Sequence, residues 1–444
     1  MQLSRALEIN PDTRLAFIGA GGKSRAMFLL AKEYGSPVIV TASTHLSQAQ
    51  TRLGARHVVV KLDGEIEDLF KEELEGITVV SGPLVADGRV QGLPFELLAA
   101  LDRAAARLGI PLLVEADGAR QRGLKAPGGH EPALPDFIGE VAVVAGLWGI
   151  GKPLNEEWVH RPEQFARLAG MEMGEVVTVK GVAGVLRHPQ GGLKDKPINA
   201  KYYAILNGAA NPHTAAAAKQ IAADILGEYQ AVIVADLGQQ SGDDEVLAVH
   251  QRIAGVVLAA GGSSRIGEPK QLLAWRGEPF VRAVAKTALA AGLSPVVVVL
   301  GAYAEQVRPA VADLPVMIVE NQAWEAGQSA SVKVGLQALP AGTGGAVFLL
   351  VDQPQIPVQL IESLAAKHAE SLAPVVAPLV DGQRGNPVLF DRRTFADLHK
   401  IEGDKGGRQL FSKYQLAWVP WVDPAAALDV DTLEDLARLL NYED

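Results

Sequence analysis

Short apolar runs alternate with amphipathic segments along the whole chain. The runs at 15–18, 38–40 and 253–258 end in loops rich in Gly, Ser or Thr, which is typical of buried strands. The segments at 25–34 and 280–291 place apolar residues at helical spacing. Strands that alternate with helices predict an α/β protein whose sheets are mostly parallel and covered on both faces. Further strands are predicted at 57–60, 78–81, 110–114, 231–235, 296–300, 316–319, 346–351 and 374–379, and further helices at 328–339 and 357–370.

The alternation stops in a polar, Gly-rich stretch that begins at Asp236, and it restarts at Ile253. A chain of 444 residues is also too long for one ordinary core, so two domains are expected. We therefore predict a first domain over 1–240, a linker over 241–252 and a second domain over 253–444.

Composition narrows the classes of function. The net charge of −10 argues against a nucleic-acid-binding surface, because such a surface needs a basic face. The sequence has no cysteine, which excludes disulfides, thiolate metal sites and cysteine nucleophiles. It also has no apolar run of membrane-spanning length and no signal-peptide core. We expect a soluble cytoplasmic protein without nucleic-acid or membrane partners.

A glycine-rich loop, Gly19-Ala-Gly-Gly-Lys-Ser24, lies between the first predicted strand and helix. Gly19, Gly21 and Gly22 would let backbone N–H groups face phosphates, Lys23 would neutralise the terminal phosphates and Ser24 would bind Mg²⁺. Phe17 stands where the first glycine of a full phosphate loop belongs. The shorter form resembles the loop of ligases that bind ATP while activating a carboxylate. The alternative is an ordinary strand-to-helix turn.

Two acidic residues follow the strand predicted at 110–114. Either Glu115 or Asp117 suits the second Mg²⁺ contact of a phosphate-loop protein, which usually lies at the end of a buried strand. The alternative is an acidic residue that caps the turn before Gly118.

A second glycine-rich loop follows the strand at 253–258 and carries two cations, Arg265 and Lys270. Backbone N–H groups and positive charge at a strand end favour a phosphate chain. The loop lacks the Gly-x-Gly-x-x-Gly spacing of a dinucleotide site, and the alternative is a plain surface loop.

Carboxylates occur at the expected edge of the second sheet. Asp352 ends the strand at 346–351, and Asp429 and Asp431 precede a helix near the C-terminus. Two such carboxylates suit a Mg²⁺–triphosphate site. Of Asp429 and Asp431, we interpret one as the N-cap of that helix and favour Asp431 as the metal ligand.

Six motifs follow one another in the second half. They are Leu258-Ala-Ala-Gly-Gly-Ser-Ser-Arg-Ile-Gly with Pro269-Lys-Gln-Leu-Leu, Asn321-Gln-Ala-Trp-Glu-Ala-Gly327 with Ser329-Ala-Ser331, Asp352-Gln-Pro354, Arg384-Gly-Asn-Pro-Val-Leu-Phe390, Gly403-Asp-Lys-Gly-Gly-Arg408 and Asp429-Val-Asp-Thr432. Their order resembles the MobA-like nucleotidyltransferase family, which includes molybdenum cofactor cytidylyltransferase. The Leu-Ala-Ala-Gly form is similar to its cytidylyl branch, whereas the guanylyl branch usually has Leu-Ala-Gly-Gly.

This resemblance implies a Rossmann-like nucleotidyltransferase domain that moves a cytidylyl group from CTP to the phosphate of molybdopterin, with Mg²⁺ as cofactor. Arg265 and Lys270 would stabilise the charge on the leaving pyrophosphate, and Asp352 and Asp431 would hold Mg²⁺. The implied nucleotide-binding residues are Leu258, Ala259, Ala260, Gly261, Gly262, Ser263, Ser264 and Gly267. The implied contacts to the phosphate of the pterin substrate are Arg384, Asn386 and Arg408.

Motifs of the first half also occur in a fixed order. They are residues 19–24 and 41–46, Glu115-Ala-Asp-Gly-Ala-Arg120 with Leu124-Lys-Ala-Pro127, His130-Glu-Pro132 and Val159-His-Arg-Pro162. Together they resemble the selenium-dependent hydroxylase accessory (YqeC-like) family. The resemblance implies an α/β domain with a degenerate P-loop, whose own reaction is not settled, and a molybdenum hydroxylase of the xanthine dehydrogenase type as client.

Two other functions stay open at this level. The same transferase fold permits another small phosphorylated acceptor. Alternatively, the chain is a carrier and chaperone that hands a nucleotide-bearing cofactor to a hydroxylase, with NTP hydrolysis at the first loop driving release.

Overall fold

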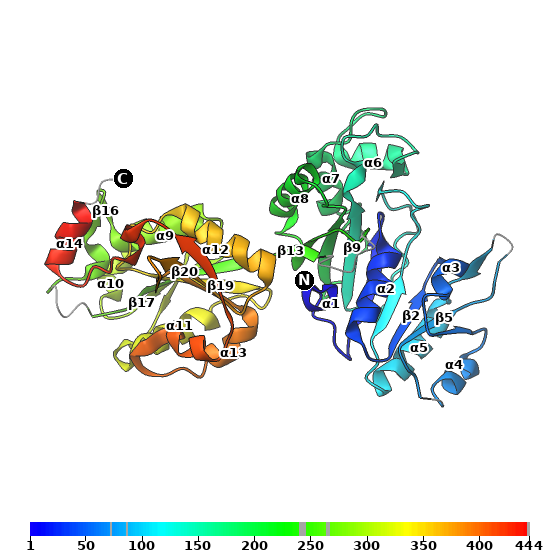
Figure 1. Ribbon diagram of the computed structural model, residues 1–444, viewed down its shortest axis with the longest axis horizontal. Coiled ribbons are helices and arrows are strands. Elements are labelled where there is room, and N and C mark those ends of the chain that lie inside the picture. The colour runs from blue at the N-terminus through cyan, green and yellow to red at the C-terminus, as the bar shows by residue number, and fades with distance from the viewer. Residues whose placement is uncertain (72, 86–87, 239–245, 263–266, 442–444) are drawn as a thin grey trace. The chain divides into compact units, whose positions relative to one another are not determined.

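The computed structural model describes residues 1–71, 73–85, 88–238, 246–262 and 267–441 (Figure 1). The chain divides into two compact units, Met1–His250 and Gln251–Asp444. Each is an α/β unit with a mostly parallel sheet, as the alternation of strands and helices predicts. Within the described ranges, no helix is long and apolar enough to cross a membrane.

The first unit is built on a nine-stranded sheet. Its elements are α1 (Leu3–Ala6), β1 (Arg14–Gly19), α2 (Lys23–Tyr34), β2 (Val38–Ala42), β3 (His45–Ser47), α3 (Gln48–Thr51), β4 (Arg56–Val59), α4 (Asp63–Leu69), β5 (Ile77–Ser81), β6 (Arg89–Gln91), α5 (Phe95–Arg107), β7 (Leu112–Glu115), β8 (Leu124–Lys125), β9 (Glu140–Gly146), η1 (Leu147–Gly149), β10 (Val159–His160), α6 (Pro162–Ala169), α7 (Val179–Arg187), β11 (Lys201–Asn207), α8 (Pro212–Ile225), β12 (Ala231–Ala235) and β13 (Val246–Gln251).

The strand order of this sheet is β13-β12-β11-β9-β1-β7-β2-β5-β4. β1 lies between β7 and β9 and pairs with both in parallel. The side chains of β1, β2 and β7 are almost wholly buried, because helices cover both faces of the sheet. The loops that leave the carboxyl ends of β1, β2, β7 and β9 meet at one edge, where ligands of open α/β sheets bind.

The first unit differs from the sequence prediction at β9, at β13 and in several further elements, among them β11 and α5. β9 was not among the predicted strands, although its run Glu140-Val-Ala-Val-Val-Ala-Gly146 is apolar, and it joins β1 to β11. Residues 246–251, predicted as linker, form β13 at the edge of the sheet. β13 has only two fully buried side chains, Val246 and Val249, so its sequence is more like that of a loop. Residues 241–245 of the predicted linker lie outside the described ranges.

The second unit is built on an eight-stranded sheet. Its elements are β14 (Ile253–Ala259), η2 (Lys270–Leu272), β15 (Ala274–Trp275), β16 (Glu278–Pro279), α9 (Phe280–Ala290), β17 (Val296–Leu300), α10 (Ala304–Val307), η3 (Arg308–Ala310), β18 (Met317–Glu320), η4 (Trp324–Ala326), α11 (Gln328–Gln337), β19 (Gly345–Leu350), α12 (Val358–Ser371), β20 (Val375–Val380), β21 (Gln383–Arg384), β22 (Val388–Asp391), η5 (Arg392–Thr394), α13 (Phe395–Leu398), η6 (Gly403–Ser412), β23 (Leu416–Trp421), η7 (Pro424–Ala427) and α14 (Leu433–Leu440).

Its strand order is β18-β17-β14-β19-β22-β20-β21, and β23 pairs with β20. The first four strands are parallel, and β22 runs antiparallel to both of its neighbours. Figure 1 shows α9 and α12 on one side of this sheet and α11 and α13 on the other. Alternate residues of β14 enter two separate cores, Val257 with α9 and α12, and Val256 with α11. The central strand is therefore buried on both faces and gives a fixed base for the loop that follows it.

Candidate functional site

A cavity of about 500 Å³ opens at the carboxyl edge of the second sheet, around the end of β14. The predicted residues that line it are Leu258, Ala260, Gly261, Gly262, Lys270, Asp352 and Asp431. Ala259 points away from the cavity into the core. Gly267 is described but does not line this cavity, and Ser263, Ser264 and Arg265 lie outside the described residues. The fold therefore brings one loop, one cation and two carboxylates to one place.

The backbone of this loop is held from below by Gln271, which is 1% exposed. Its side-chain amide donates to the carbonyl oxygens of Ala259 and Gly261, at 2.9 and 2.8 Å. Gly301, at the end of β17, packs against the same loop, because a Cβ there would lie 2.5 Å from the carbonyl oxygen of Ala260. Sequence reasoning assigned no role to Gln271, since a buried glutamine has no distinguishing pattern. Its contacts fix which way the loop's N–H groups face.

Lys270 lies between the two predicted metal ligands. Its Nζ is 3.2 Å from Asp352 Oδ2 and 2.7 Å from Asp431 Oδ1. Partial burial alone would lower the pKa of Lys270, but the negative charges of Asp352 and Asp431 outweigh it and raise this pKa. Lys270 is therefore an ammonium ion at neutral pH.

A third carboxylate, that of Asp429, lies close to this group. It accepts a hydrogen bond from Gln353 Nε2 at 2.7 Å. Desolvation, together with the charges of Asp352 and Asp431, raises the pKa of Asp429 to about 6. The N-cap interpretation of Asp429 or Asp431 is wrong, because Thr432 caps α14 by accepting from the backbone N–H of Asp435. Both aspartates thus remain available to the site.

The carboxylates suit a hard divalent cation. Asp352 Oδ1 is buried and has no hydrogen-bond partner among the described residues, which is costly unless something positive binds it. Oxygen donors from Asp352, Asp431 and Asp429 are the kind that Mg²⁺ and Mn²⁺ prefer. In the part of the chain that the structure describes, however, no three His, Asp or Glu side chains are already arranged around a metal position. Lys270 lies between the carboxylates instead.

The predicted contacts to a phosphorylated acceptor divide into two groups. Asn386 and Arg408 line a smaller cavity of about 60 Å³ that shares Leu258, Gln328 and Leu350 with the larger one. Arg384 is exposed and lies over the ring of Phe411, 5.2 Å from its centroid, outside both cavities. The structure therefore brings two of the three residues to the site and not the third.

The larger cavity also has lining residues to which sequence reasoning gave no role. They are Trp324, Glu325, Gly327, Gln328, Ser331 and Asp404. Most belong to the 321–331 motif, which follows β18 and lies at the carboxyl edge, where the order of strands and helices predicts it. The Trp324 ring lies against the loop, since a Cβ on Gly262 would be 3.0 Å from it.

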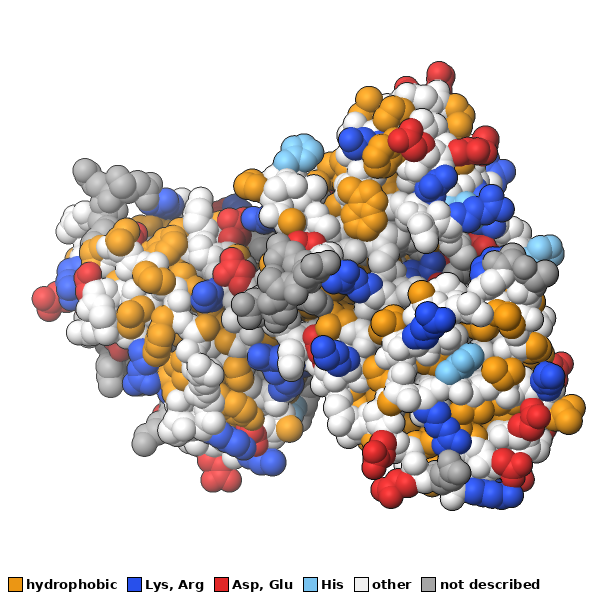
Figure 2. Space-filling model, turned by 45° about the vertical axis from the view of Figure 1, so that its right-hand side comes forward, with side chains coloured by type: hydrophobic (Ala, Val, Ile, Leu, Met, Phe, Trp, Pro, Cys, Tyr) orange, Lys and Arg blue, Asp and Glu red, His pale blue; other side chains and the backbone are white. Residues whose placement is uncertain are grey.

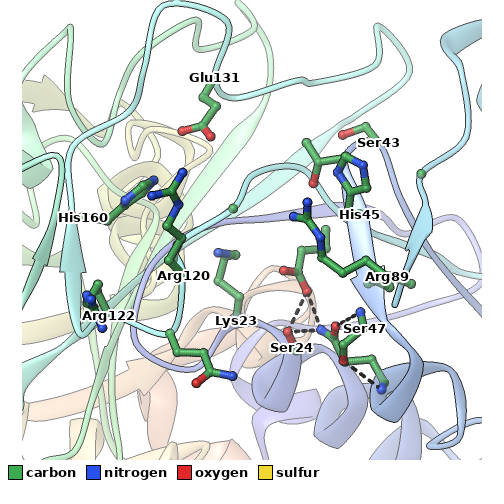
Figure 3. Close-up of a pocket in the computed structure, with 18 of the residues that line it drawn as sticks. Lys23, Ser24, Ser43, His45, Ser47, Arg89, Arg120, Arg122, Glu131 and His160 are labelled. Atoms are coloured by element: carbon green, nitrogen blue, oxygen red, sulfur yellow. Dashed lines mark hydrogen bonds between the residues drawn. The ribbon is translucent and has the colours of Figure 1, made fainter. Parts of the chain in front are cut away.

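A larger cavity, of about 1190 Å³, lies at the carboxyl edge of the first sheet (Figure 3). Gly21 and Gly22, which follow β1, and Lys23 and Ser24, which begin α2, line it. The predicted loop needs its glycines: Gly19, Gly21 and Gly22 all have positive φ. A Cβ on Gly19 would lie 2.2 Å from the carbonyl oxygen of Val144. The loop is therefore tightly packed against β9.

Lys23 and Asp117 form a buried ion pair beneath this loop. Lys23 Nζ lies 2.9 Å from Asp117 Oδ1 and donates to the carbonyl oxygen of Gly19 at 2.8 Å. Asp117 Oδ2 accepts from the backbone N–H of Gly19, also at 2.8 Å. Burial opposes protonation of Lys23, but Asp117 and Glu115 outweigh it and raise its pKa. In this structure the ammonium group of Lys23 therefore pairs with Asp117.

Ser24 and Glu115 form the other half of the loop's polar network. Ser24 Oγ donates to Glu115 Oε2 at 2.7 Å, and the Gln50 side-chain amide donates to both residues. Burial raises the pKa of Glu115 although Lys23 is close. Asn207 supports the loop by donating to the carbonyl oxygen of Gly21 at 2.7 Å. Of the two acidic residues that the sequence left open, Glu115 lies beside the hydroxyl, and Asp117 beside the lysine.

Alternating charges run from the buried Asp117 to Glu131 and Arg161 on the cavity wall. Asp117 pairs with Lys125 at 2.8 Å, Lys125 with Glu131 at 2.7 Å, and Glu131 with Arg161 at 2.7 Å. Against the opposing effect of burial, hydrogen bonds from Arg161 and Lys125 lower the pKa of Glu131 to about 2. Arg161 itself holds a left-handed backbone at φ 60°.

We expect Glu131→Gln to destabilise the protein by about 2–3 kcal/mol at pH 7, because the lowered pKa of Glu131 is stabilisation that only its ionised form supplies. A carboxyl with a lowered pKa stabilises fully above its unfolded-state pKa near 4.5 and loses this as the pH falls toward 2. Urea unfolding should therefore show a large difference between the variant and the wild type at pH 7 and a smaller one at pH 3. Glu157→Gln, at an exposed position, is the matched control. A difference that stays constant with pH would contradict the prediction.

The two halves are similar to different known proteins. Residues 255–417 match the family described as MobA-like NTP transferase domain, and residues 15–163 match the family described as YqeC protein. The chain is 34% identical to nicotine blue oxidoreductase of Paenarthrobacter nicotinovorans over 204 residues, which cover 42% of this chain and 96% of that protein. It is 31% identical to the uncharacterized protein YqeC of Escherichia coli over 196 residues, which cover 42% of this chain and 72% of that protein.

Similarity extends to two further proteins. A probable molybdenum cofactor guanylyltransferase of Bacillus cytotoxicus is 25% identical over 42% of this chain and 96% of that protein. The crystal structure of Rv0371C of Mycobacterium tuberculosis in complex with manganese is 30% identical, with a TM-score of 0.39, and covers 44% of this chain and 100% of that one. The chain therefore belongs to the YqeC family through its N-terminal half and to the MobA-like NTP transferase family through its C-terminal half, which makes it an enzyme of the nucleotidyltransferase class.

Proposed function

We propose that the C-terminal half transfers the cytidylyl group of CTP to the phosphate of molybdopterin, giving the dinucleotide cofactor and pyrophosphate. The observation that carries the proposal is the meeting of Lys270, Asp352 and Asp431 at the mouth of a rigid glycine-rich loop. Such a cluster is what phosphate chains and their cations require. The finished cofactor would pass to a molybdenum hydroxylase of the xanthine dehydrogenase type.

In the proposed reaction, an oxygen of the molybdopterin phosphate attacks the α-phosphorus of CTP, and the bond from that phosphorus to the β-phosphate oxygen breaks. The nucleophile is already an anion, so no general base is needed. Backbone N–H groups of residues 260–262 would orient the triphosphate, with Ser263, Ser264 and Arg265 continuing the same loop. Lys270 would stabilise the negative charge that develops on pyrophosphate. Asn386 and Arg408 would receive the phosphate of the acceptor from the adjoining cavity.

Mg²⁺ would be held by Asp352 and by Asp431, with Asp429 as the near alternative. When bound, the ion would neutralise the triphosphate and bring its oxygens into line. The unpartnered Oδ1 of Asp352 supports this assignment. For the ion to reach both carboxylates, the Lys270 ammonium would have to turn toward the phosphates.

We expect the purified protein, with Mg²⁺ and molybdopterin, to prefer CTP over GTP and ATP. We place the base of the nucleotide beside Ala260, which lines the cavity and whose methyl group would then take space that a purine needs. One methyl group changes the ratio of kcat/KM values between two substrates by roughly 10–200-fold at most. Ala260→Gly should therefore narrow the CTP preference by about tenfold, measured as the ratio of kcat/KM values for CTP and GTP. Equal use of GTP by the wild type would contradict the cytidylyl assignment.

The same assay separates the other two functions. If CTP is consumed with another phosphorylated acceptor but not with molybdopterin, the acceptor assignment is wrong and the transferase assignment stands. If no pyrophosphate is released under any condition while the nucleotide-bearing cofactor binds tightly, the chain is a carrier.

For the N-terminal half we propose that residues 19–24 bind the polyphosphate of a nucleoside triphosphate. The positive-φ glycines and the contact between Ser24 and Glu115 support this proposal. Ser24 and Glu115 would hold a Mg²⁺ ion, and Lys23 would exchange Asp117 for the terminal phosphate. Nucleotide binding then requires that the buried pair beneath the loop open.

A further inference from the structure

The first-unit cavity carries more positive charge than its phosphate loop accounts for. Its basic lining residues are Lys23, Arg25, Arg89, Arg120, Arg122 and Arg161, and its acidic ones are Glu115 and Glu131. Of these, Arg161 pairs with Glu131, Lys23 pairs with Asp117 beneath the loop, and Glu115 accepts a hydrogen bond from Ser24. On the face shown in Figure 2, acidic and basic side chains are interspersed. Among the described residues that line the cavity, basic side chains outnumber acidic ones six to two, which favours anionic ligands.

Arg89 and Arg120 reach into the cavity from opposite walls (Figure 3). Arg89 belongs to β6, which pairs antiparallel with β3 so that Arg89 faces Ser47. Arg120 belongs to the 118–123 loop that follows β7. Lys23 and Ser24 lie on the floor between the two arginines. A ligand that touches both arginines would therefore stand directly beside a polyphosphate held by residues 19–24.

The loop that carries Arg120 has an unusual and fixed backbone. Arg120 and Gln121 both have positive φ, 46° and 62°, where non-glycine residues are uncommon. Such outliers persist where the surroundings enforce them, and they cluster at functional sites. Here the carbonyl oxygen of Gly123 accepts from the backbone N–H of Gly146 at 2.8 Å, and Arg122 Nε donates to the carbonyl oxygen of Glu156 at 2.6 Å. These hydrogen bonds tie the loop that carries Arg120 to β9 and to the backbone at Glu156.

The cavity is large enough for two ligands. Its volume of about 1190 Å³ exceeds the roughly 300–1,000 Å³ of sites for single small molecules. The cavity has two anion-binding parts. One is the phosphate loop on its floor, and the other is the group of arginines on its walls. Arginine is suited to the wall part, because its planar guanidinium binds phosphate through two parallel hydrogen bonds.

We propose that this cavity binds a second, phosphate-bearing small molecule beside the nucleotide, with its phosphate held between Arg89 and Arg120. The proposal rests on the proposed polyphosphate site at residues 19–24, whose terminal phosphate would face the phosphate of the second ligand. Arg122, on the same loop as Arg120, adds positive charge to that wall. The N-terminal half is thus a two-substrate site.

The test uses the full chain, with inorganic triphosphate and Mg²⁺ as the probe for the loop and phenyl phosphate as the probe for the wall. In isothermal titration calorimetry, phenyl phosphate should bind to protein already saturated with triphosphate. Arg89→Ala and Arg120→Ala should each weaken phenyl phosphate roughly 10–100-fold, the effect of losing hydrogen bonds to a charged group, and change triphosphate affinity less than about threefold. Lys23→Ala should weaken the binding of triphosphate roughly 10–100-fold and change the affinity for phenyl phosphate less than about threefold. Arg107→Ala, at an exposed position outside the cavity, is the matched control.

The outcomes separate the two proposals. If triphosphate displaces phenyl phosphate, or if phenyl phosphate binding does not respond to Arg89 and Arg120, the second site is overturned. If triphosphate fails to bind but phenyl phosphate binds through both arginines, the polyphosphate assignment fails and the anion-binding wall stands. Arg120→Lys keeps the positive charge but loses the two parallel hydrogen bonds of the guanidinium. It should therefore bind phenyl phosphate with an affinity between those of the wild type and Arg120→Ala. Thermal unfolding of each variant would reveal a folding defect.

Discussion

Asp352→Ala should reduce nucleotidyl transfer by about 10³-fold while leaving the protein folded. Transferases of this kind depend on charge stabilisation of a phosphate chain, and removing one stabilising group from such a site typically costs 10²–10³-fold or more. Asp352 lies two residues after the end of β19, and its backbone is held because its carbonyl oxygen accepts from the backbone N–H of Val430 at 3.1 Å. The measurement is pyrophosphate release from CTP with saturating Mg²⁺ and molybdopterin.

Three comparisons make this result specific. Asp352→Asn keeps the shape of the side chain but not its charge, so it should be nearly as inactive as the alanine variant. Glu362→Gln, which alters an exposed carboxylate on α12, should retain full activity. Triphosphate binding at residues 19–24 should be unchanged, since that loop belongs to the other compact unit. Substantial activity in Asp352→Asn would mean that the carboxylate does not hold the metal.

Lys270→Ala should lower kcat by roughly 10²–10³-fold and at the same time tighten the binding of divalent cations. The two effects have one cause. The Lys270 ammonium lies within 3.2 Å of Asp352 and 2.7 Å of Asp431, so it competes with a metal ion for the same oxygens. Without it, the two carboxylates attract a divalent ion more strongly, but the charge that would stabilise the leaving pyrophosphate is lost.

Titration of Mn²⁺ by electron paramagnetic resonance measures the cation affinity directly, in the absence of nucleotide. Lys270→Arg is the matched variant, because it keeps a cation near the carboxylates and should bind Mn²⁺ about as weakly as the wild type. Weaker Mn²⁺ binding in Lys270→Ala would show that Lys270 positions the carboxylates rather than competing for them.

Local patterns in the sequence predicted the α/β class and many strands of both sheets, but not β9 or β11 of the first sheet. The strands at 253–258 and 296–300 and the helix at 280–291 appear almost unchanged, since short apolar runs and helical spacing directly reflect burial. Mixed patterns were less informative. β13 is an edge strand with exposed positions, so its mixed pattern predicts a linker and not a strand. Thr432 followed three residues later by Asp435 is a capping-box pattern that indicates Thr432 as the N-cap of α14. The general preference for aspartate at N-caps favours Asp429 or Asp431 instead.

The site could be predicted only in part. Sequence indicated the residue types at the end of each strand, because chain order fixes which loops share an edge. It could not indicate that Lys270 would lie between Asp352 and Asp431, which are 82 and 161 residues away along the chain. Nor did it indicate Gln271 or the facing pair Arg89 and Arg120. These roles depend on side-chain directions across separate elements, for which local spacing carries no information.

The edge strand β13 limits how the two halves can be produced separately. A shortened chain that ended at residue 240 would leave out β13 and expose the hydrogen-bonding edge of β12, which invites pairing between molecules and aggregation. A second-half fragment that began after residue 253 would remove the start of β14, its central strand. Only Arg252 separates β13 from β14 along the sequence. Recombinant halves that keep both sheets intact should therefore be divided at that residue.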